Sequence, residues 1–340
     1  MGMRLIYNLK TAKLKDVPEQ ARWAESLGYD GLCTEETGHD PFYPLLLAAS
    51  ATTRLTLETR VAIVFPRSPM SVAYAAWDLQ EFSGGRFRLG MGTQVKGHME
   101  RRFSVPWDSP GPRLREYVQA LHAIWDTWQE GKKLDFRGSF YNFSLMTPFF
   151  SPGANSVPKP RVYISAINPY NCRTAGQLCD GLALHPISSA KYVTEAVKPN
   201  VTRGAEKAGR SPSDIMLNGS SFVITGPSRE AVEAKKAAAK QQIAFYASTR
   251  TYTPVLEVHG FQEVSPALHA LSVKGEWDKM GDLISDEMLD TLSILGPYDE
   301  VAGRIKERFG GLLDEYVFSM DTPTPSDEQA LKKIIEELKS

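Results

Sequence analysis

A dense group of hydrogen-bond donors follows the short apolar run Arg86–Met91. Cationic, amide and hydroxyl side chains at this density are suited to binding an anionic ligand. Gly90 and Gly92 thin the backbone at the end of the run, which permits a close approach. A solvated basic loop after an ordinary strand would have the same composition, and the residues alone leave both readings open. The donors are Thr93, Gln94, Lys96, His98, Arg101 and Arg102.

A second candidate group lies in the polar stretch EETGHD at residues 35–40. His39 is a candidate for moving a proton, since histidine is the side chain most often used for general acid–base catalysis. Glu35 or Glu36 would orient His39 or act as acid and base, although surface carboxylates before a helix are equally ordinary. His185 follows an apolar run, which predicts a packed and hydrogen-bonded histidine there. No metal site is expected from these residues.

A third candidate is the segment Asn168–Asn171, which opens a predicted helix. The free backbone N–H groups of a helix start can bind phosphate. Every helix start offers such groups, so this signal is weak without further support.

The predicted strands and helices determine where these candidate residues lie. Strands and helices alternate through most of the chain. Strands are predicted at Leu5–Leu9, Tyr29–Thr34, Leu55–Phe65, Arg86–Met91, Arg161–Ser165, Gly181–His185, Ile215–Ile224 and Glu315–Met320. The intervening helices are predicted at Asp16–Gly28, Pro44–Thr53, Ser71–Phe82, Arg113–Gln129, Cys172–Leu178, Ser188–Ala208, Glu230–Ala247, Pro297–Phe309 and Asp327–Leu338.

Eight strand–helix units predict a (β/α)8 TIM barrel, formed by residues 1–340 as a single domain. An insertion is expected at about 132–160, after the fourth unit, and a helical excursion at about 249–290, before the eighth strand. A doubly wound sheet is the alternative, but it would show a GxGxxG turn after the first strand and none is present. In a barrel, the loops after the strands meet at one mouth, where the three candidate groups would converge.

The composition is that of an ordinary globular protein, with 42% hydrophobic and 23% charged residues. The formal net charge of −1 argues against general binding of nucleic acid or of a membrane surface. Cys33, Cys172 and Cys179 form no CxxC pair, which suits a reducing cytoplasm. The sequence shows neither a secretory signal nor an apolar run long enough to span a membrane, and a cytoplasmic location is expected.

Several segments together resemble the bacterial luciferase-like flavin and deazaflavin oxidoreductases. They are FPRSPMSVAYAAWDLQ, SGGRFRLGMGTQVKGHMERRF, LREYVQALHAIWDTW and YISAINPYNCRTAGQLCDGLALHP, and their joint spacing covers nearly the full chain. The FPRSP and TQVKGH pieces look most like the branch that uses the deazaflavin coenzyme F420 rather than FMN. The family fold is a barrel with an insertion, in agreement with the count of units.

The resemblance also implies roles for individual residues. His39 would exchange a proton beside the ring, with Glu35 or Glu36 as its partner, and Thr59–Arg60 falls where the family often has a bulge with a non-prolyl cis peptide. The family has a small residue at the second bulge position, so Arg60 is a departure that bears on the substrate. The residues implied to bind cofactor are Thr59, Arg60, Thr93, Gln94, Lys96, His98, Ala166, Ile167, Asn168, Tyr170 and Asn171.

The resulting hypothesis is an F420-dependent oxidoreductase that transfers a hydride between the deazaflavin and a small organic substrate. The alternative is an FMN-dependent monooxygenase that receives reduced flavin from a separate reductase. A third reading is a non-catalytic barrel that binds flavin. Because family members are often dimers, a homodimer is a further expectation.

Overall fold

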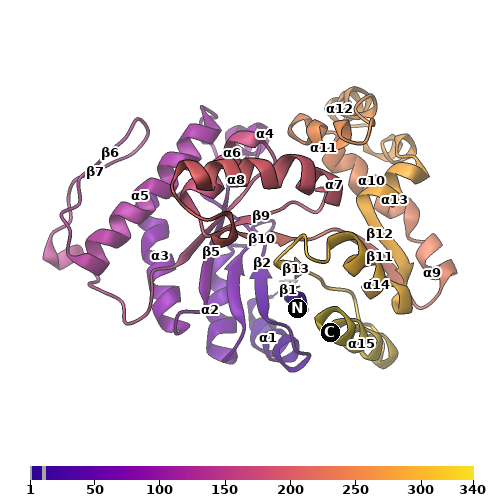
Figure 1. Cartoon of the computed structure of the whole chain (residues 1–340), viewed down its shortest axis with the longest axis horizontal. Coiled ribbons are helices and arrows are strands. Elements are labelled where there is room, and N and C mark those ends of the chain that lie inside the picture. Colours follow the sequence, from indigo (N-terminus) through magenta and orange to yellow (C-terminus); the bar gives the residue numbers. More distant parts are fainter. Residues whose placement is uncertain (1, 10–12) are drawn as a thin grey trace.

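The computed structural model describes residues 2–9 and 13–340, which contain a closed barrel of parallel strands (Figure 1). The strands follow the order β3-β2-β1-β13-β10-β9-β8-β5, and a pairing between β3 and β5 closes the barrel. This confirms the predicted (β/α)8 architecture. The barrel strands are β1 (Arg4–Asn8), β2 (Gly31–Thr34), β3 (Thr56–Thr59), β5 (Phe87–Gly92), β8 (Arg161–Ser165), β9 (Gly181–Ala183), β10 (Met216–Gly219) and β13 (Glu315–Val317).

The predicted strand Leu55–Phe65 is interrupted by a bulge. Glu58 pairs with Arg88 on β5, and Ala62 pairs with Met91. The first pair and the second are four residues apart on the β3 side but three apart on β5, so the β3 side holds one extra residue. Pairing resumes in β4 (Ala62–Ile63). The Arg60–Val61 peptide bond is cis and non-prolyl, one position beyond the Thr59–Arg60 pair that the family resemblance indicated.

The predicted strand Ile215–Ile224 is also wrong as a single element. It divides at Ser220 and Ser221 into β10, which belongs to the barrel, and β11 (Phe222–Gly226), which leaves it. β11 pairs in parallel with β12 (Ser293–Pro297), a strand that the sequence analysis missed. The polar residues Asn218–Ser221 interrupt the apolar run at this exit, and the prediction of one strand overlooked them.

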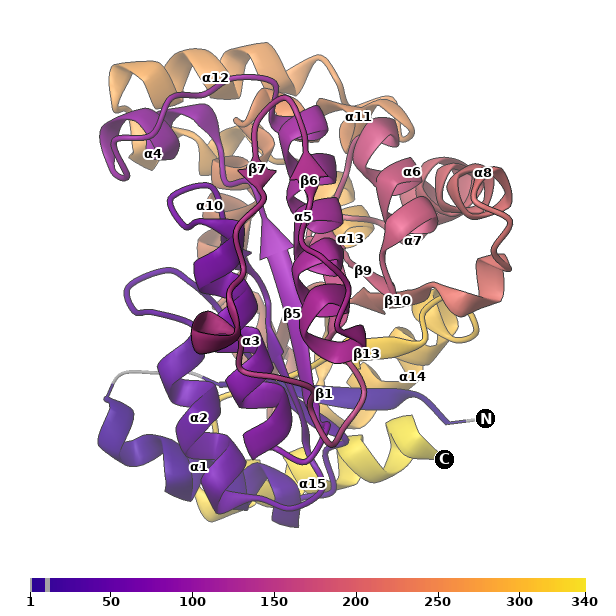
Figure 2. The ribbon, with the colours of Figure 1, turned by 90° about the vertical axis from the view of Figure 1, so that its left-hand side faces the viewer.

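Helices surround the strands, and their bounds agree broadly with the predicted ones (Figures 1 and 2). The predicted helix Ser188–Ala208 consists of α7 (Ala190–Tyr192), a π-helical turn at Val193–Val197 and α8 (Lys198–Lys207). The predicted helix Glu230–Ala247 is interrupted, forming α9 (Arg229–Glu233) and α10 (Lys236–Ala247). The others are α1 (Val17–Ser26), α2 (Phe42–Ala51), α3 (Pro69–Phe82), α5 (Pro110–Glu130), α6 (Pro169–Leu178), α14 (Tyr298–Phe309) and α15 (Pro325–Lys339).

Additional short elements occupy the two irregular regions of the chain. Between α5 and β8, β6 (Phe136–Arg137) and β7 (Asn142–Phe143) form an antiparallel pair. Between α10 and β12 lie α11 (Thr253–Glu257), α12 (Val264–Lys274) and α13 (Asp286–Leu292), together with the 3₁₀ turns Arg250–Tyr252, Trp277–Lys279 and Gly281–Leu283. In Figure 2 the β5 arrow points toward the end of the barrel at which α12 lies, and α15 lies at the opposite end.

The segment after β5 was expected to be a loop, but it contains the helix α4 (Lys96–Arg101). Val95 O accepts backbone hydrogen bonds from His98 and Met99, and the Met99 side chain is fully buried. Met99 is a single buried apolar residue within a polar run, and one such residue gives no periodic pattern from which a helix could be predicted.

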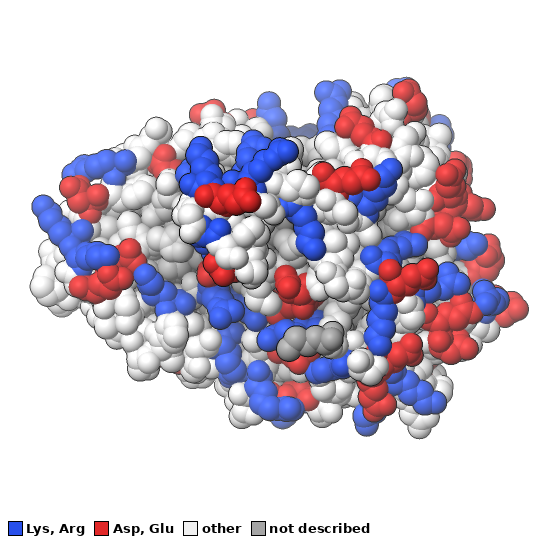
Figure 3. All heavy atoms as spheres, in the orientation of Figure 1, with Lys and Arg blue, Asp and Glu red and all other residues white. Residues whose placement is uncertain are grey.

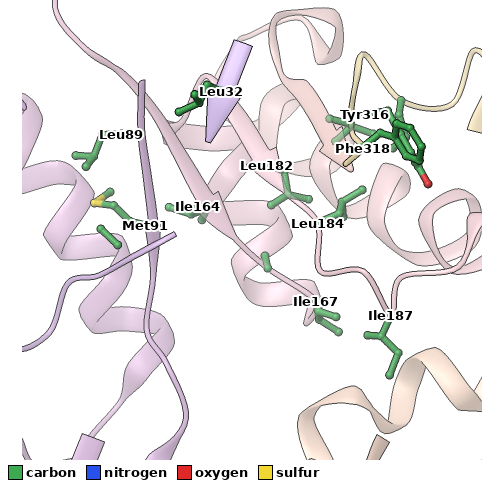
Figure 4. Close-up of a cluster of buried hydrophobic side chains, with 14 of the residues drawn as sticks. Leu32, Leu89, Met91, Ile164, Ile167, Leu182, Leu184, Ile187, Tyr316 and Phe318 are labelled. Atoms are coloured by element: carbon green, nitrogen blue, oxygen red, sulfur yellow. The ribbon is translucent and has the colours of Figure 1, made fainter. Parts of the chain in front are cut away.

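Apolar side chains fill the space between the strands and the surrounding helices. Leu89, Met91, Ile164 and Leu182 belong to one cluster of buried side chains (Figure 4). Full burial of each such side chain contributes about 1.5–3 kcal/mol, which makes the barrel a rigid support for the loops at its mouth. Cys33 is also fully buried, in agreement with the small core residue that was expected.

On the molecular surface, positive and negative side chains are interspersed over the face drawn in Figure 3. This face therefore lacks the extended field of one sign that nonspecific binding to nucleic acid requires. None of the helices in the described part of the chain is long and apolar enough to cross a membrane.

Candidate active site

The mouth of the barrel is crossed by the side chain of Arg60. The bulge after β3 directs this side chain inward, so that its guanidinium reaches the ends of β9 and β10. Nη2 donates to Leu184 O at 2.7 Å and to Ser220 Oγ at 3.0 Å, and Nη1 donates to Asn218 O at 3.4 Å. Arg60 therefore forms part of the floor of the mouth.

Below Arg60, the barrel interior holds a buried network of charged groups. Arg88 Nη1 lies 2.6 Å from Glu315 Oε2 and 3.9 Å from Glu58 Oε2. The Asn218 amide donates to Glu58 at 3.1 Å and to Glu315 at 3.3 Å. Burial raises the pKa of Glu58 to about 7, although the charge of Arg60 opposes this rise. The sequence analysis missed this network, whose only sign was the charged residues within apolar strand runs.

The loop after β2 is fixed to β4 by Glu36. Its Oε2 accepts a hydrogen bond of 2.7 Å from the Ile63 backbone N–H. Arg67 Nη1 donates to both Glu36 oxygens at 2.9 Å, and Arg67 Nη2 donates to Asp40 at 2.9 Å. These contacts commit Glu36 to holding the loop in place, so of the two predicted partners for His39 only Glu35 remains available.

Glu35 and His39 are both exposed on this loop. Glu35 Oε1 accepts a hydrogen bond of 2.8 Å from the Asn8 amide at the end of β1. Burial raises the pKa of Tyr246, and the negative charge of Glu35 adds to that rise, so the two groups interact across the mouth. His39 is accessible to a ligand from this position.

The predicted donors after β5 divide into two groups. Thr93 and Gln94 are half-buried and stabilise their own turn: Thr93 Oγ1 donates to Gln94 O at 2.9 Å, and the Val95 N–H donates to Gln94 Oε1 at 3.0 Å. Gln94 has a φ of 60°. Lys96 and His98 are exposed on α4, and Lys96 Nζ lies 3.9 Å from a carboxylate oxygen of Glu100.

Thr59 supports the bulge rather than the surface of the mouth. Its side chain is fully buried, donates to Gly90 O at 2.8 Å and accepts from the Gly90 N–H at 2.9 Å. A Cβ at Gly90 would lie 1.9 Å from Thr59 O, and one at Gly92 would lie 2.6 Å from a methyl group of Val61. Both glycines are therefore required for the close packing of β5 against the bulge, as their positions suggested.

The predicted residues after β8 form the start of α6. Ala166 and Ile167 are buried, and Asn168 caps the helix by accepting a 2.9 Å hydrogen bond from the Asn171 N–H. Tyr170 is 38% exposed. Asn171 Oδ1 is buried and has no hydrogen-bond partner among the described residues. This helix start thus combines free backbone donors with an unsatisfied acceptor.

An aromatic wall lies on the far side of the mouth. The ring of His185 packs against Tyr246 and Tyr252, with centroids 4.5 and 4.8 Å away. Its Nδ1 accepts a hydrogen bond of 3.2 Å from the Ile187 N–H. Burial, reinforced by the charge of Arg60, lowers the pKa of His185 to about 3, so the ring is neutral at physiological pH. This confirms the predicted packed histidine.

Cavities elsewhere in the molecule involve different residues. One of about 490 Å³ lies beside β12 and α14, lined in part by Asp290, Leu295, Arg304 and Arg308. Its lining includes none of the predicted site residues, which gather at the barrel mouth instead.

The arrangement fits a flat, anionic cofactor on two grounds. Close packing of Gly90 and Gly92 fixes the backbone of the bulge at the mouth, where a planar ring could rest, and the start of α6 offers N–H donors beside the unsatisfied Asn171 oxygen. Flavin-type cofactors combine a planar ring with a hydroxylated chain and a phosphate, which need these two kinds of surface.

Comparison with known proteins is consistent with this arrangement. The model of the luciferase-like monooxygenase family matches residues 4–315. An uncharacterised protein of Mycobacterium tuberculosis is 46% identical over 290 residues, which are 85% of each chain. A 5,10-methylenetetrahydromethanopterin reductase of Archaeoglobus fulgidus is 30% identical over 313 residues, covering 90% of this chain and 89% of the reductase.

Solved structures share the fold. The coenzyme F420-dependent tetrahydromethanopterin reductase of Methanopyrus kandleri has a TM-score of 0.77 and 21% identity, covering 99% of this chain and 98% of its own. The FMN-bound oxygenating constituent of 3,6-diketocamphane monooxygenase from Pseudomonas putida has a TM-score of 0.68 and 16% identity, covering 99% and 98%. The family match extends over most of the sequence, and this chain therefore belongs to the luciferase-like monooxygenase family of enzymes.

Proposed function

We propose that the protein is an F420-dependent oxidoreductase that transfers a hydride between the deazaflavin and a small organic substrate. The observation that carries this proposal is the packing of Gly90 and Gly92 against the bulge at the barrel mouth, next to the loop that bears His39. A planar ring placed on this bulge would have a titratable side chain available beside it. The 30% identity to a methylenetetrahydromethanopterin reductase supports the deazaflavin branch.

In this proposal the cofactor supplies the hydride chemistry, and the chain binds, orients and exchanges one proton. His39 is the proton donor or acceptor, with Glu35 as the carboxylate on the same loop. The backbone of the bulge supports the ring, and Thr93, Gln94 and His98 flank it from the β5 side. Lys96 on α4 reaches toward the acidic end of the cofactor.

The start of α6 binds the remainder of the cofactor. The backbone N–H groups after Asn168 favour a phosphate. The unpartnered Asn171 oxygen accepts a hydrogen bond from a hydroxyl of the ribityl chain, and Tyr170 covers that chain. Ala166 and Ile167 supply apolar contact.

The second candidate function is an FMN-dependent monooxygenase that obtains reduced flavin from a partner reductase. The monooxygenase description of the family and the FMN-bound structural relative support this alternative. Both candidates share the cofactor ring type and the same binding surface.

An anaerobic titration of the purified protein with F420 and with FMN, followed by quenching of cofactor fluorescence, separates the two candidates. The proposal requires micromolar or tighter binding of F420 and weaker binding of FMN. Tight binding of FMN without binding of F420 would establish the monooxygenase candidate in its place.

A further inference from the structure

The barrel holds two inward-facing guanidinium groups, those of Arg60 and Arg88, and two buried carboxylates, those of Glu58 and Glu315. Arg88 is paired with Glu315 at 2.6 Å, and Arg4 also lies 3.2 Å from Glu315. One carboxylate thus serves two cations. Glu58 is the remaining interior carboxylate, and its raised pKa leaves it partly protonated near neutrality. Within the described part of the chain, no carboxylate oxygen forms an ion pair with Arg60.

Some of the N–H donors of Arg60 also have no acceptor among the described residues. A guanidinium has five N–H donors, and the described residues accept two from Nη2 and one long bond from Nη1. Nε has no acceptor among these residues, and it is absent from the fully buried unsatisfied atoms, so it remains accessible from the mouth. Arg60 therefore donates only to neutral oxygens of the described residues, and its remaining donors are suited to an anionic ligand at the mouth.

We propose that Arg60 binds the negative charge that the cofactor ring acquires on reduction, and so favours the reduced form. The inference rests on the proposed function. Transfer of a hydride to the oxidised ring adds two electrons and one proton, which leaves a negative charge shared between N1 and the C2 carbonyl oxygen. A charge near that edge is one of the ways in which a protein tunes such a ring. The substrate is oxidised in the same step.

Arg60 interacts electrostatically with Glu58, a carboxyl whose pKa burial raises to about 7. His185 is neutral, Cys33 is a buried thiol whose pKa burial raises, and Glu35 is bound to Asn8 at the rim. The bonds to Leu184 O and Ser220 Oγ hold the guanidinium in one orientation, so the charge is fixed before the ligand arrives. Fixed charges of this kind stabilise a developing anion more effectively than mobile solvent does.

The test compares the dissociation constants of oxidised and chemically reduced F420, measured anaerobically for the wild type, Arg60→Met and Arg60→Lys. Arg60→Met is expected to lower the preference for the reduced form by about tenfold, which corresponds to about 30 mV for a two-electron couple. Arg60→Lys should lose less, because it keeps the charge. The control, Arg22→Met on the exposed face of α1, removes the same charge and should leave the preference unchanged.

An unchanged preference in Arg60→Met would overturn the inference, and an effect of that variant only on binding of an acidic substrate would overturn it in favour of a substrate role. If Arg60→Met does not fold, the absorbance of reduced F420 bound to the wild type decides the matter between pH 5 and 8. The bound ring should stay anionic at a lower pH than the free ring, and identical titrations would refute the inference. If F420 binds to no variant but FMN does, the proposed cofactor is wrong, and the same comparison with FMN still tests Arg60.

Discussion

Arg67 Nη1 lies 2.9 Å from each carboxylate oxygen of Glu36, and this contact joins the loop after β2 to the loop after β4. The Arg67 side chain is 23% exposed and that of Glu36 is 7% exposed, so the pair is shielded from most of the solvent. Although burial opposes it, the negative charge of Glu36 raises the pKa of Arg67. The position of His39 therefore depends on an ion pair in which His39 takes no part.

Replacement of Glu36 by Gln should lower the free energy of unfolding by about 2 kcal/mol, because a hydrogen bond to a charged partner is lost and Arg67 is left without it. Urea unfolding followed by circular dichroism measures the loss. The control is Glu100→Gln, which removes the exposed contact to Lys96 and should have little effect. Equal stability of both variants would show that the Glu36–Arg67 pair does not hold the loop.

Replacement of His39 by Gln should lower the turnover number by about 10²- to 10⁴-fold, the usual contribution of general acid–base catalysis. The dissociation constant of F420 should stay within about twofold, since the residue exchanges a proton and does not anchor the cofactor. Stopped-flow oxidation of reduced F420, with an acceptor found in a panel of carbonyl and imine compounds, measures turnover. Retention of wild-type turnover and of its pH profile would remove His39 from the mechanism.

Replacement of Gly90 by Ala should destabilise the protein by about 3 kcal/mol, because the new methyl group would overlap the Thr59 carbonyl and force the two strands apart. The matched control is Gly38→Ala, where a Cβ meets nothing within 4 Å and the backbone needs no positive φ. That variant should be within about 0.5 kcal/mol of the wild type. The midpoints of urea unfolding provide the comparison, and a tolerated Gly90→Ala would mean that the bulge is loosely packed.

The raised pKa of Glu58 predicts a pH dependence of stability. The folded protein holds the Glu58 proton up to about pH 7, whereas the ordinary carboxyl releases it at about 4.5. The native state therefore binds more protons in this range, and the free energy of unfolding falls as the pH rises from about 4.5 to 7. Glu58→Gln should abolish this contribution, and urea unfolding at intervals of half a pH unit would reveal it.

His185 makes the opposite contribution to the pH dependence of stability. Its pKa is lowered from 6.5 to about 3, so the unfolded chain binds the extra proton and the protein loses stability as the pH falls through this range. The two slopes oppose each other between about pH 4.5 and 6.5. The Glu58→Gln variant should consequently show a steeper loss of stability on acidification than the wild type, and parallel curves would show that Glu58 titrates normally in the folded protein.

The architecture was accessible from the sequence because the alternation of strands and helices is a local, repeated signal. The bulge was indicated only by the family resemblance, one position early, and the exit of β11 was missed although the polar residues Asn218–Ser221 interrupt the apolar run there. The buried network of Glu58, Arg88, Asn218 and Glu315 could not be predicted from the sequence either. Glu58 and Arg88 are adjacent only because β3 and β5 pair, and pairing between separate strands cannot be read from either strand alone.

The site was predictable in outline for a similar reason. The loops after β2, β5 and β8 could be placed at one mouth by the topology of a barrel. Which carboxylate holds the loop depends on contacts between chain segments, so the role of Glu36 could not be derived from the sequence. The aromatic wall was divided between two regions, since Tyr246 and Tyr252 are far from His185 in sequence.

The pairing of β11 with β12 has a consequence for how this enzyme can diversify. All of residues 227–292, including Tyr246 and Tyr252, lie between two strands that are held side by side outside the barrel. Because the ends of this segment are already joined, doubling its length would cost only about 0.6 kcal/mol of loop-closure entropy. A change in the length of this segment would therefore alter the wall formed by Tyr246 and Tyr252 without changing the pairing of the barrel strands.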